Sequence, residues 1–125
     1  MRKLKASEVK SIRLQLLLAQ NGRCALCQLP CTPQNARLDH DHSTGAVRGV
    51  LHNGCNAMLG KIENNAARFG VKSIPAFGSG LGRYLAAHAT NTTGLIHPLH
   101  KTEDEKREAR NKKAREKRAA LKGTV

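Results

Sequence analysis

Leu38-Asp39-His40-Asp41-His42 is the stretch that decides the architecture of this chain, together with the cysteines on either side of it. Cys24-Ala25-Leu26-Cys27 precedes the stretch, and Cys55-Asn56 follows it. The alternating histidines and carboxylates offer a neutral base and hard oxygen ligands, whereas the flanking cysteines are soft ligands suited to zinc. We therefore predict a fold stapled by zinc that also carries a second, oxygen-rich metal site.

The composition limits the size of the hydrophobic core. The chain has 125 residues, with no Trp, one Tyr and two Phe. This length fits one domain with tails, and the shortage of aromatic side chains leaves little material for a large core. A bound metal would help such a chain to fold.

The charge of the chain indicates a polyanionic partner. The formal net charge is +13 and the isoelectric point is near 10.3, which favours nucleic acid over a membrane surface. The longest apolar run, Leu16 to Ala19, is too short for a membrane span or a secretory signal. We expect a reducing cytoplasm, where the four cysteines are thiols or metal ligands.

Charge and composition divide the chain into three parts. Residues 1–64 are expected to hold an N-terminal helix and the metal-binding core. Residues 65–100 are expected to be a less regular extension of helix and loop. Residues 101–125 carry ten Lys or Arg against five acidic residues and are expected to be a basic tail, helical or partly disordered.

Within these parts, the sequence predicts an α+β fold with a strand, strand, helix unit at its centre. A helix with Val9, Ile12, Leu16 and Ala19 on one face should stop at Asn21-Gly22. Strands are predicted over 37–40 and 46–51, joined by a Ser43-Thr44-Gly45 turn, and a helix over 53–64. Glycines and Pro75 predict an irregular segment over 70–82, followed by a helix over 81–89. A charged helix is predicted over 102–122, either solvated or laid against phosphate.

Cysteine and histidine spacing predicts one structural zinc site. Cys24 and Cys27 form one pair, and His52 and Cys55, also three residues apart, form a second pair at the start of the predicted helix. Cys31 competes with His52 for the fourth position, because it lies four residues after Cys27 and thiolate is the softer ligand. The spacing favours His52, and Cys31 would then be a free, partly buried thiol.

These residues resemble the phage recombination endonuclease VII family, within the His-Me finger or HNH nucleases. The resemblance runs from about Gln20 to Gly60 and is carried by 22–27, by 38–51 and by Cys55-Asn56, in order and spacing. It implies a ββα-metal active site on a zinc-bound scaffold that hydrolyses DNA phosphodiester bonds, with branched or distorted DNA as substrate. Two positions differ: the family usually has cysteine at His52, and the founding member has an acidic residue near Leu59.

Chemistry and resemblance together assign the catalytic roles. His40 is the expected general base, because a neutral imidazole can accept a proton from water at neutral pH. Asp39 and Asn56 are expected to hold one Mg²⁺ or Mn²⁺ through oxygen atoms. By resemblance, His42 contacts the scissile phosphate or supports the metal site, with a plain turn histidine as the alternative. Asp41 is expected to orient a histidine or to accept backbone hydrogen bonds in the turn.

DNA is the expected partner, and a homodimer is left open. The candidate phosphate-binding residues are Arg37, Arg48, Lys61, Lys112, Lys113 and Arg115. The function that this pattern favours is a Mg²⁺-dependent, structure-selective endonuclease. The alternatives are a zinc-bound DNA-binding protein without catalysis and a non-specific nicking HNH nuclease.

Overall fold

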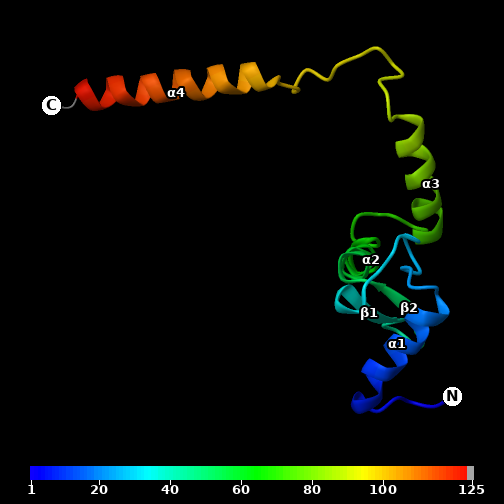
Figure 1. Cartoon of the computed structure of the whole chain (residues 1–125). Helices are drawn as coiled ribbons and strands as arrows, with labels where there is room; N and C mark the ends of the chain where they lie inside the picture. Colours follow the sequence, from blue (N-terminus) through cyan, green and yellow to red (C-terminus); the bar gives the residue numbers. More distant parts are fainter. Residues whose placement is uncertain (124–125) are drawn as a thin grey trace. The chain divides into compact units, whose positions relative to one another are not determined.

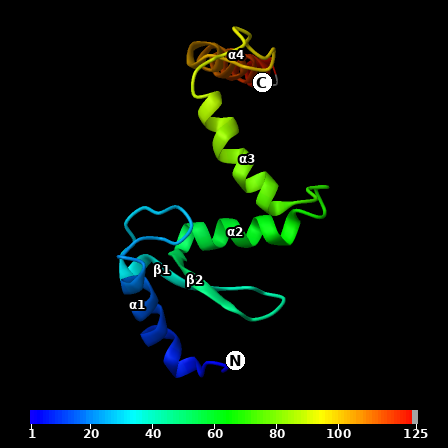
Figure 2. The ribbon, with the colours of Figure 1, turned by 90° about the vertical axis from the view of Figure 1, so that its right-hand side faces the viewer.

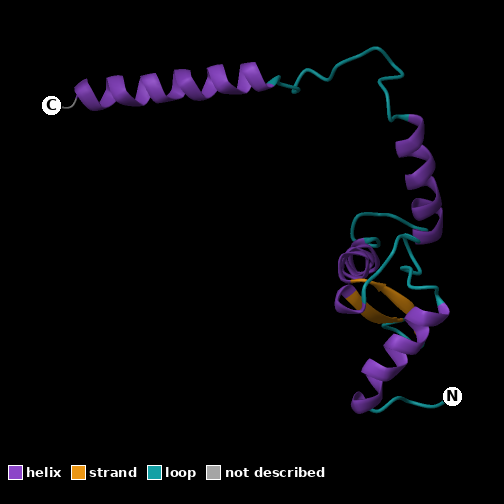
Figure 3. Ribbon diagram, in the orientation of Figure 1, coloured by secondary structure: helices purple, strands orange, loops and turns teal. Residues whose placement is uncertain are grey.

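The folded core of the chain combines a two-stranded antiparallel sheet with helices (Figure 1). The computed structural model describes residues 1–123, and residues 124–125 of the predicted tail lie outside the described residues. The chain divides into two units, Met1–Leu81 and Gly82–Val125. All strand residues of the described part belong to the first unit, which has the predicted α+β composition (Figure 3).

The N-terminal helix stops at the predicted place. A single 3-10 turn, η1 (Ala6–Glu8), leads into α1 (Val9–Ala19). Beyond it, Asn21 and Gly22 have φ values of 58° and 69°. In this left-handed conformation the Gly22 amide donates a hydrogen bond to the Leu17 carbonyl, which closes the end of the helix.

The buried face of α1 agrees with the predicted one at Val9, Ile12 and Leu16, which are half-buried, but its most buried residue is Leu17. Leu17 is buried, Leu16 packs partly against the core, and Ala19 is exposed. The prediction placed the centre of the apolar face one row away, because three consecutive leucines, Leu16 to Leu18, fit more than one face of a helix.

The hairpin contains an irregularity that the sequence did not predict. Strands β1 (Ala36–His40) and β2 (Val47–His52) pair antiparallel, each within one residue of its predicted bounds. Asp39 lies opposite Gly49, but His40 lies opposite Val47, so Arg48 is an extra residue in β2. Such a β-bulge redirects the side chain at the extra position.

Two helices enclose the hairpin. Helix α2 (Asn53–Asn65) follows β2 with no intervening loop, and both α1 and α2 contact both strands (Figure 2). The buried cluster between these elements is small. It consists of Leu17, Cys24, Cys31, Ala36, Val50 and Leu51.

Helix α3 (Ile74–Ala87) corrects the prediction of an irregular segment over 70–82. The Ser73 hydroxyl accepts a hydrogen bond from the Ala76 amide and caps the helix start. Pro75 lies in the first turn, where no backbone amide is needed. The glycines at 78, 80 and 82 lower the helix propensity by about 1 kcal/mol each without preventing the helix.

The charged helix near the C-terminus agrees with its prediction. Helix α4 (Glu103–Gly123) begins after Thr102, whose hydroxyl accepts a hydrogen bond from the Glu105 amide. None of the described residues of α4 is buried. Among residues 1–123, no helix is both long and apolar enough to cross a membrane.

The side chain of Gln20 connects the end of α1 to the hairpin through hydrogen bonds. The Gln20 amide nitrogen donates to the carbonyls of Arg23 and Val50, at 2.8 and 2.9 Å. Its amide oxygen accepts from the Val50 backbone amide at 2.9 Å. Gly49 leaves room for this contact, because a Cβ there would lie 3.3 Å from the Gln20 oxygen.

We predict that Gln20→Ala lowers the free energy of unfolding of the metal-loaded protein by about 1–3 kcal/mol, because it removes the side-chain partner of the partly buried Val50 backbone amide. Chemical denaturation measures this loss. The matched control is Gln15→Ala on the exposed face of the same helix, for which we expect a change of about 0.5 kcal/mol or less. Equal effects of the two substitutions would contradict the anchoring role of Gln20.

Candidate functional site

The loop between α1 and β1 forms a tight turn around the first cysteine pair. The Gln28 amide donates to the Cys24 carbonyl at 2.9 Å, and Gln28 has a φ of 67°, which lets the chain reverse between the two cysteines and the rest of the loop. The Ala25 amide donates to the Val50 carbonyl at 3.0 Å. The turn is therefore hydrogen-bonded directly to β2.

Four metal-binding side chains converge at this turn. The Sγ atoms of Cys24, Cys27 and Cys55 and a ring nitrogen of His52 all lie within 4.8 Å of one another. His52 Nδ1 is 3.2 Å from Cys27 Sγ and 3.7 Å from Cys55 Sγ. Zinc bonds of about 2.0–2.3 Å place neighbouring ligand atoms of a tetrahedron at comparable separations. The group can hold a metal ion such as zinc.

A backbone carbonyl orients the histidine of this group. His52 Nε2 lies 2.8 Å from the Pro30 carbonyl oxygen. A carbonyl oxygen only accepts, so Nε2 carries the proton and donates it, and Nδ1 turns its lone pair toward the sulfur atoms. Hydrogen bonding of the second ring nitrogen in this way is typical of metal-binding histidines. The contact with Pro30 could not be predicted from the sequence, because the two residues are 22 positions apart.

The thiols of the group differ in acidity. Burial opposes ionisation of Cys24, but hydrogen bonds from the backbone amides of Cys27, His52 and Leu26 outweigh it and lower the Cys24 pKa to about 6. Burial and the neighbouring sulfurs of Cys27 and Cys24 raise the pKa of Cys55 to about 11. A cation at the centre of the group would favour the thiolate form of each cysteine.

Cys31, the alternative fourth ligand, lies outside this group. Its Sγ donates weak hydrogen bonds to the carbonyls of Thr32 and Asn35, at 3.7 and 3.6 Å. The side chain is 6% exposed and belongs to the buried cluster. Burial raises the pKa of the thiol, which favours its neutral form.

The predicted catalytic residues of β1 and the following turn lie in different environments. Asp39 is buried, with 6% exposure. His40 and His42 are both exposed, and their rings stack with centroids 4.8 Å apart and planes 7° from parallel. The two imidazoles therefore form one solvent-facing pair beside a buried carboxylate.

Asp41, between the two histidines, shapes the turn. Its Oδ1 accepts hydrogen bonds from the Ser43 hydroxyl at 2.6 Å, the Ser43 amide at 2.8 Å and the Thr44 amide at 3.2 Å. The hydroxyl and amide hydrogen bonds lower the pKa of Asp41. This is the turn role that the sequence left open beside histidine orientation.

Arg48 connects the buried carboxylate to α2. Its guanidinium donates to both oxygens of Asp39, at 2.7 and 3.1 Å, and to both oxygens of Glu63, at 3.0 and 3.1 Å. The hydrogen bonds from Arg48 lower the pKa of Glu63. Sequence reasoning did not single out Glu63. The sequence signal that could have found it is its spacing in the predicted helix, seven residues and about two turns after Asn56.

The other site candidates of the first unit are Asn56, which is half-buried, and two exposed basic residues. Asn56 is half-buried on α2 and shares a helix face with Glu63, because seven residues are close to two turns. Arg37 on β1 and Lys61 on α2 are exposed. A shallow hollow of about 200 Å³ is lined by seven residues, namely Ala25, Leu26, Asp39, Arg48, Gly49, Leu51 and Leu59.

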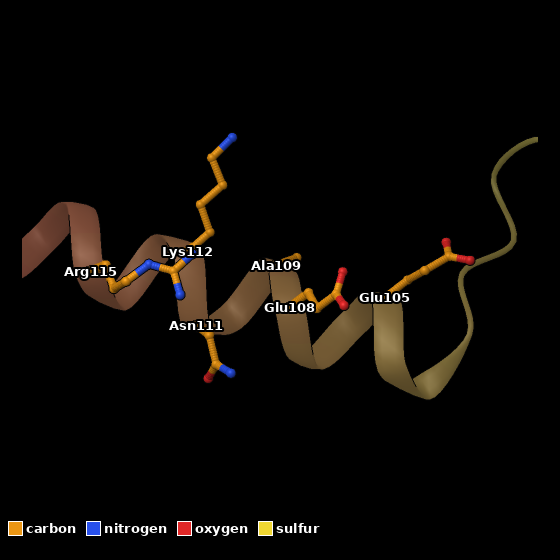
Figure 4. Close-up of a pocket in the computed structure, with 6 residues that line it drawn as sticks. All are labelled: Glu105, Glu108, Ala109, Asn111, Lys112 and Arg115. Atoms are coloured by element: carbon orange, nitrogen blue, oxygen red, sulfur yellow. The ribbon is translucent and has the colours of Figure 1, made fainter.

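The candidates of the second unit lie on α4. Lys112, Lys113 and Arg115 are all exposed. Figure 4 shows an open surface of this helix on which two carboxylates, Glu105 and Glu108, are followed along the chain by Lys112 and Arg115. All six residues that line this surface belong to α4, so it is a helix face and not an enclosed site.

The sequence matches one known family across the region just described. The family model described as recombination endonuclease VII matches residues 2–74. The match covers more than half of the 125 residues. It includes the group of Cys24, Cys27, His52 and Cys55 and the candidate metal ligands Asp39 and Asn56. The matched region is longer than the segment from Gln20 to Gly60 that carries the resemblance described above.

We predict that His52→Ala lowers the metal content of the purified protein and its melting temperature, because the group loses one of four ligands. Cys31→Ser is the matched control, since a serine hydroxyl can still donate to the same two carbonyls. We expect it to keep the metal, as measured by elemental analysis. Metal loss in Cys31→Ser together with retention in His52→Ala would reverse the ligand assignment.

Proposed function

Because the chain belongs to the recombination endonuclease VII family, we propose that it is a metal-dependent endonuclease that hydrolyses phosphodiester bonds of branched or distorted DNA. Family membership implies an endonuclease with DNA as its partner. The metal dependence, the preference for DNA structure and the role of each residue belong to the proposal. We place the reaction in a reducing cytoplasm, where thiols remain available to zinc.

The observation that carries the proposal is the placement of consecutive residues at the end of β1. His40 is exposed and stacks on His42, while the neighbouring carboxylate of Asp39 is buried. A base must reach water and the scissile phosphate, whereas a metal ligand is best held rigidly. The two adjacent side chains meet these different requirements.

In the proposed reaction, His40 acts as the general base. Its neutral imidazole accepts a proton from a water molecule, whose oxygen forms a bond to phosphorus while the bond from phosphorus to the 3′ oxygen breaks. The 3′ oxygen takes a proton from solvent. His42 lies against His40 and contacts the scissile phosphate.

Asp39 and Asn56 are the proposed ligands of a catalytic Mg²⁺ or Mn²⁺. A carboxylate and an amide oxygen suit these hard cations. A buried carboxylate needs a positively charged partner, and in this structure Arg48 supplies that partner to Asp39. When bound, the cation would stabilise charge on the phosphate and on the leaving oxygen.

Zinc is the proposed occupant of the group formed by Cys24, Cys27, His52 and Cys55. Three thiolates and an imidazole are an ordinary structural zinc environment. With four protein ligands, the zinc would have no coordination position left for a substrate, so its proposed role is to hold the core together. A homodimer stays a prediction.

We predict that His40→Ala lowers the single-turnover cleavage rate on a four-way junction by at least about 100-fold, because general bases contribute on the order of 10²–10⁴. DNA binding and zinc content should stay at wild-type levels. The matched control is His88→Ala, a histidine whose ring lies 4.7 Å from that of Tyr84 outside the proposed site, and we expect this variant to cleave normally.

The same assay distinguishes the proposed function from its alternatives. Wild-type cleavage should require Mg²⁺ or Mn²⁺ and stop with chelator, and it should be faster on junctions than on nicked or linear duplex. Equal rates on all three substrates would indicate a non-specific nicking nuclease. Binding without cleavage by folded, zinc-loaded protein would indicate a DNA-binding protein.

We further predict that the combined change Lys112→Gln, Lys113→Gln and Arg115→Gln weakens DNA binding and reduces its salt dependence. Each lost phosphate contact lowers the slope of log K against log salt by about 0.9. Titrations at several salt concentrations measure the slope. Asn111→Ala on the same helix should leave it unchanged, and an unchanged slope in the triple variant would mean that α4 is a solvated helix.

A further inference from the structure

Arg48 forms four hydrogen bonds with two carboxylates. Nε and Nη2 donate to the two oxygens of Asp39, and Nη1 and Nη2 donate to the two oxygens of Glu63. Every guanidinium nitrogen is therefore used within the protein. In this arrangement Arg48 presents little of its hydrogen-bonding capacity to a DNA phosphate, although the sequence places it among the phosphate-binding candidates.

The β-bulge explains how Arg48 reaches these partners. In a regular antiparallel ladder, the opposite residues Asp39 and Gly49 share one face, and Arg48 would point to the other face. The register shift between Asp39 and His40 breaks this alternation. Arg48 thereby approaches the buried carboxylate from the adjoining strand, next to the histidine pair.

The charges at this centre do not balance. Two carboxylates face one guanidinium, and the side chain of Asp39 is only 7% exposed while those of Glu63 and Arg48 are 31% and 34% exposed. Two carboxylates held this closely need a cation between them. Arg48 fills that position here and holds the pKa of Glu63 below its usual value, against the charge of Asp39, which raises it.

The position of Arg48 conflicts with the proposed role of Asp39 as a metal ligand. Both Asp39 oxygens accept hydrogen bonds from Arg48, and the shorter contact, to Oδ2, is 2.7 Å. A divalent cation at Asp39 needs a carboxylate lone pair facing it and places a second positive charge close to the guanidinium. Each oxygen has a second lone pair, but the two positive charges compete for the same carboxylate.

We propose that Arg48 is a displaceable counter-cation. It holds Asp39 and Glu63 together when no divalent cation is bound to Asp39, and it moves away from Asp39 when such a cation binds. The proposal rests on the proposed function, because it takes Asp39 as a ligand of that cation. Arg48 remains tethered by Glu63 on the exposed side of the centre. Its released donors face solvent beside His40 and His42, where a DNA phosphate can accept them.

This arrangement makes cation binding a competition within the protein. The free energy of the Asp39–Arg48 hydrogen bonds opposes binding of the divalent cation in the absence of DNA. A phosphate that pairs with the guanidinium removes this opposition. Arg48 is therefore a positioning residue that links occupation of the metal site to the presence of DNA.

The test measures Mn²⁺ binding to the full-length, zinc-loaded protein without DNA, by electron paramagnetic resonance. We expect Arg48→Ala to bind Mn²⁺ at least about tenfold more tightly than wild type, because the cation no longer competes with two hydrogen bonds between charged groups. Arg48→Lys should give an intermediate gain, because an ammonium group cannot bridge both carboxylates as a planar fork does. The matched control is Arg37→Ala, an exposed charge lost from β1, with a change of about twofold or less.

Each outcome decides the proposal. Unchanged or weaker Mn²⁺ binding in both Arg48 variants would overturn it and make the contacts purely structural. If circular dichroism or zinc content shows that Arg48→Ala does not fold, because Asp39 is left buried without a partner, Arg48→Lys alone decides in the same way.

Asp39→Asn separates this proposal from the proposed function. We expect it to abolish Mn²⁺ binding while zinc stays bound. If Mn²⁺ binds equally well to Asp39→Asn, the assignment of the catalytic metal site fails and the displacement fails with it. If Asp39→Asn abolishes binding but the Arg48 variants show no gain, the metal site stands and only the displacement is wrong.

Discussion

The Cys24–Cys27 turn is held against the junction of β2 and α2, and the other elements of the core are positioned by this connection. The buried cluster is small, and two of its members, Cys24 and Cys31, are themselves cysteines. Such a core stabilises a short chain only weakly, so a metal bound by Cys24, Cys27, His52 and Cys55 would contribute much of the folding free energy. The same bonds would fix the first turn of α2, and Asn56 follows Cys55 directly. Holding the turn together therefore also places Asn56 relative to β1.

The hairpin separates soft from hard ligands. His52, at one end of β2, belongs to the sulfur-rich group, whereas Arg48, near the other end, contacts the carboxylates of Asp39 and Glu63. Four residues of strand span about 13 Å, so the backbone itself keeps the two groups apart. In the proposed function their different chemistry would select different ions, because thiolates and imidazole favour zinc whereas carboxylate and amide oxygens favour magnesium or manganese. One short sheet thus supports both the fold and the proposed chemistry.

Features set by local spacing could be predicted from the sequence, and features set by distant contacts could not. The hairpin, α2 and the convergence of two Cys/His pairs followed from turn residues and three-residue spacings, and the family resemblance is confirmed. The β-bulge at Arg48 and its contact with Glu63, fifteen residues away, left no signal, because a charged residue in a strand is compatible with either face. The predicted start of α3 was wrong, because the prediction gave more weight to the glycines of this segment than to the helix cap supplied by Ser73.

The two proposed metal sites share one hairpin, one for stability and one for DNA cleavage. Anomalous X-ray diffraction from crystals of the zinc-loaded protein grown with Mn²⁺ and an uncleavable DNA junction would locate both ions. We expect a zinc signal among Cys24, Cys27, His52 and Cys55, and a separate manganese signal that contacts Asp39 and Asn56 beside His40. Manganese located away from Asp39, or no second site while the DNA is bound at the hairpin, would show that the hairpin does not hold a catalytic metal site.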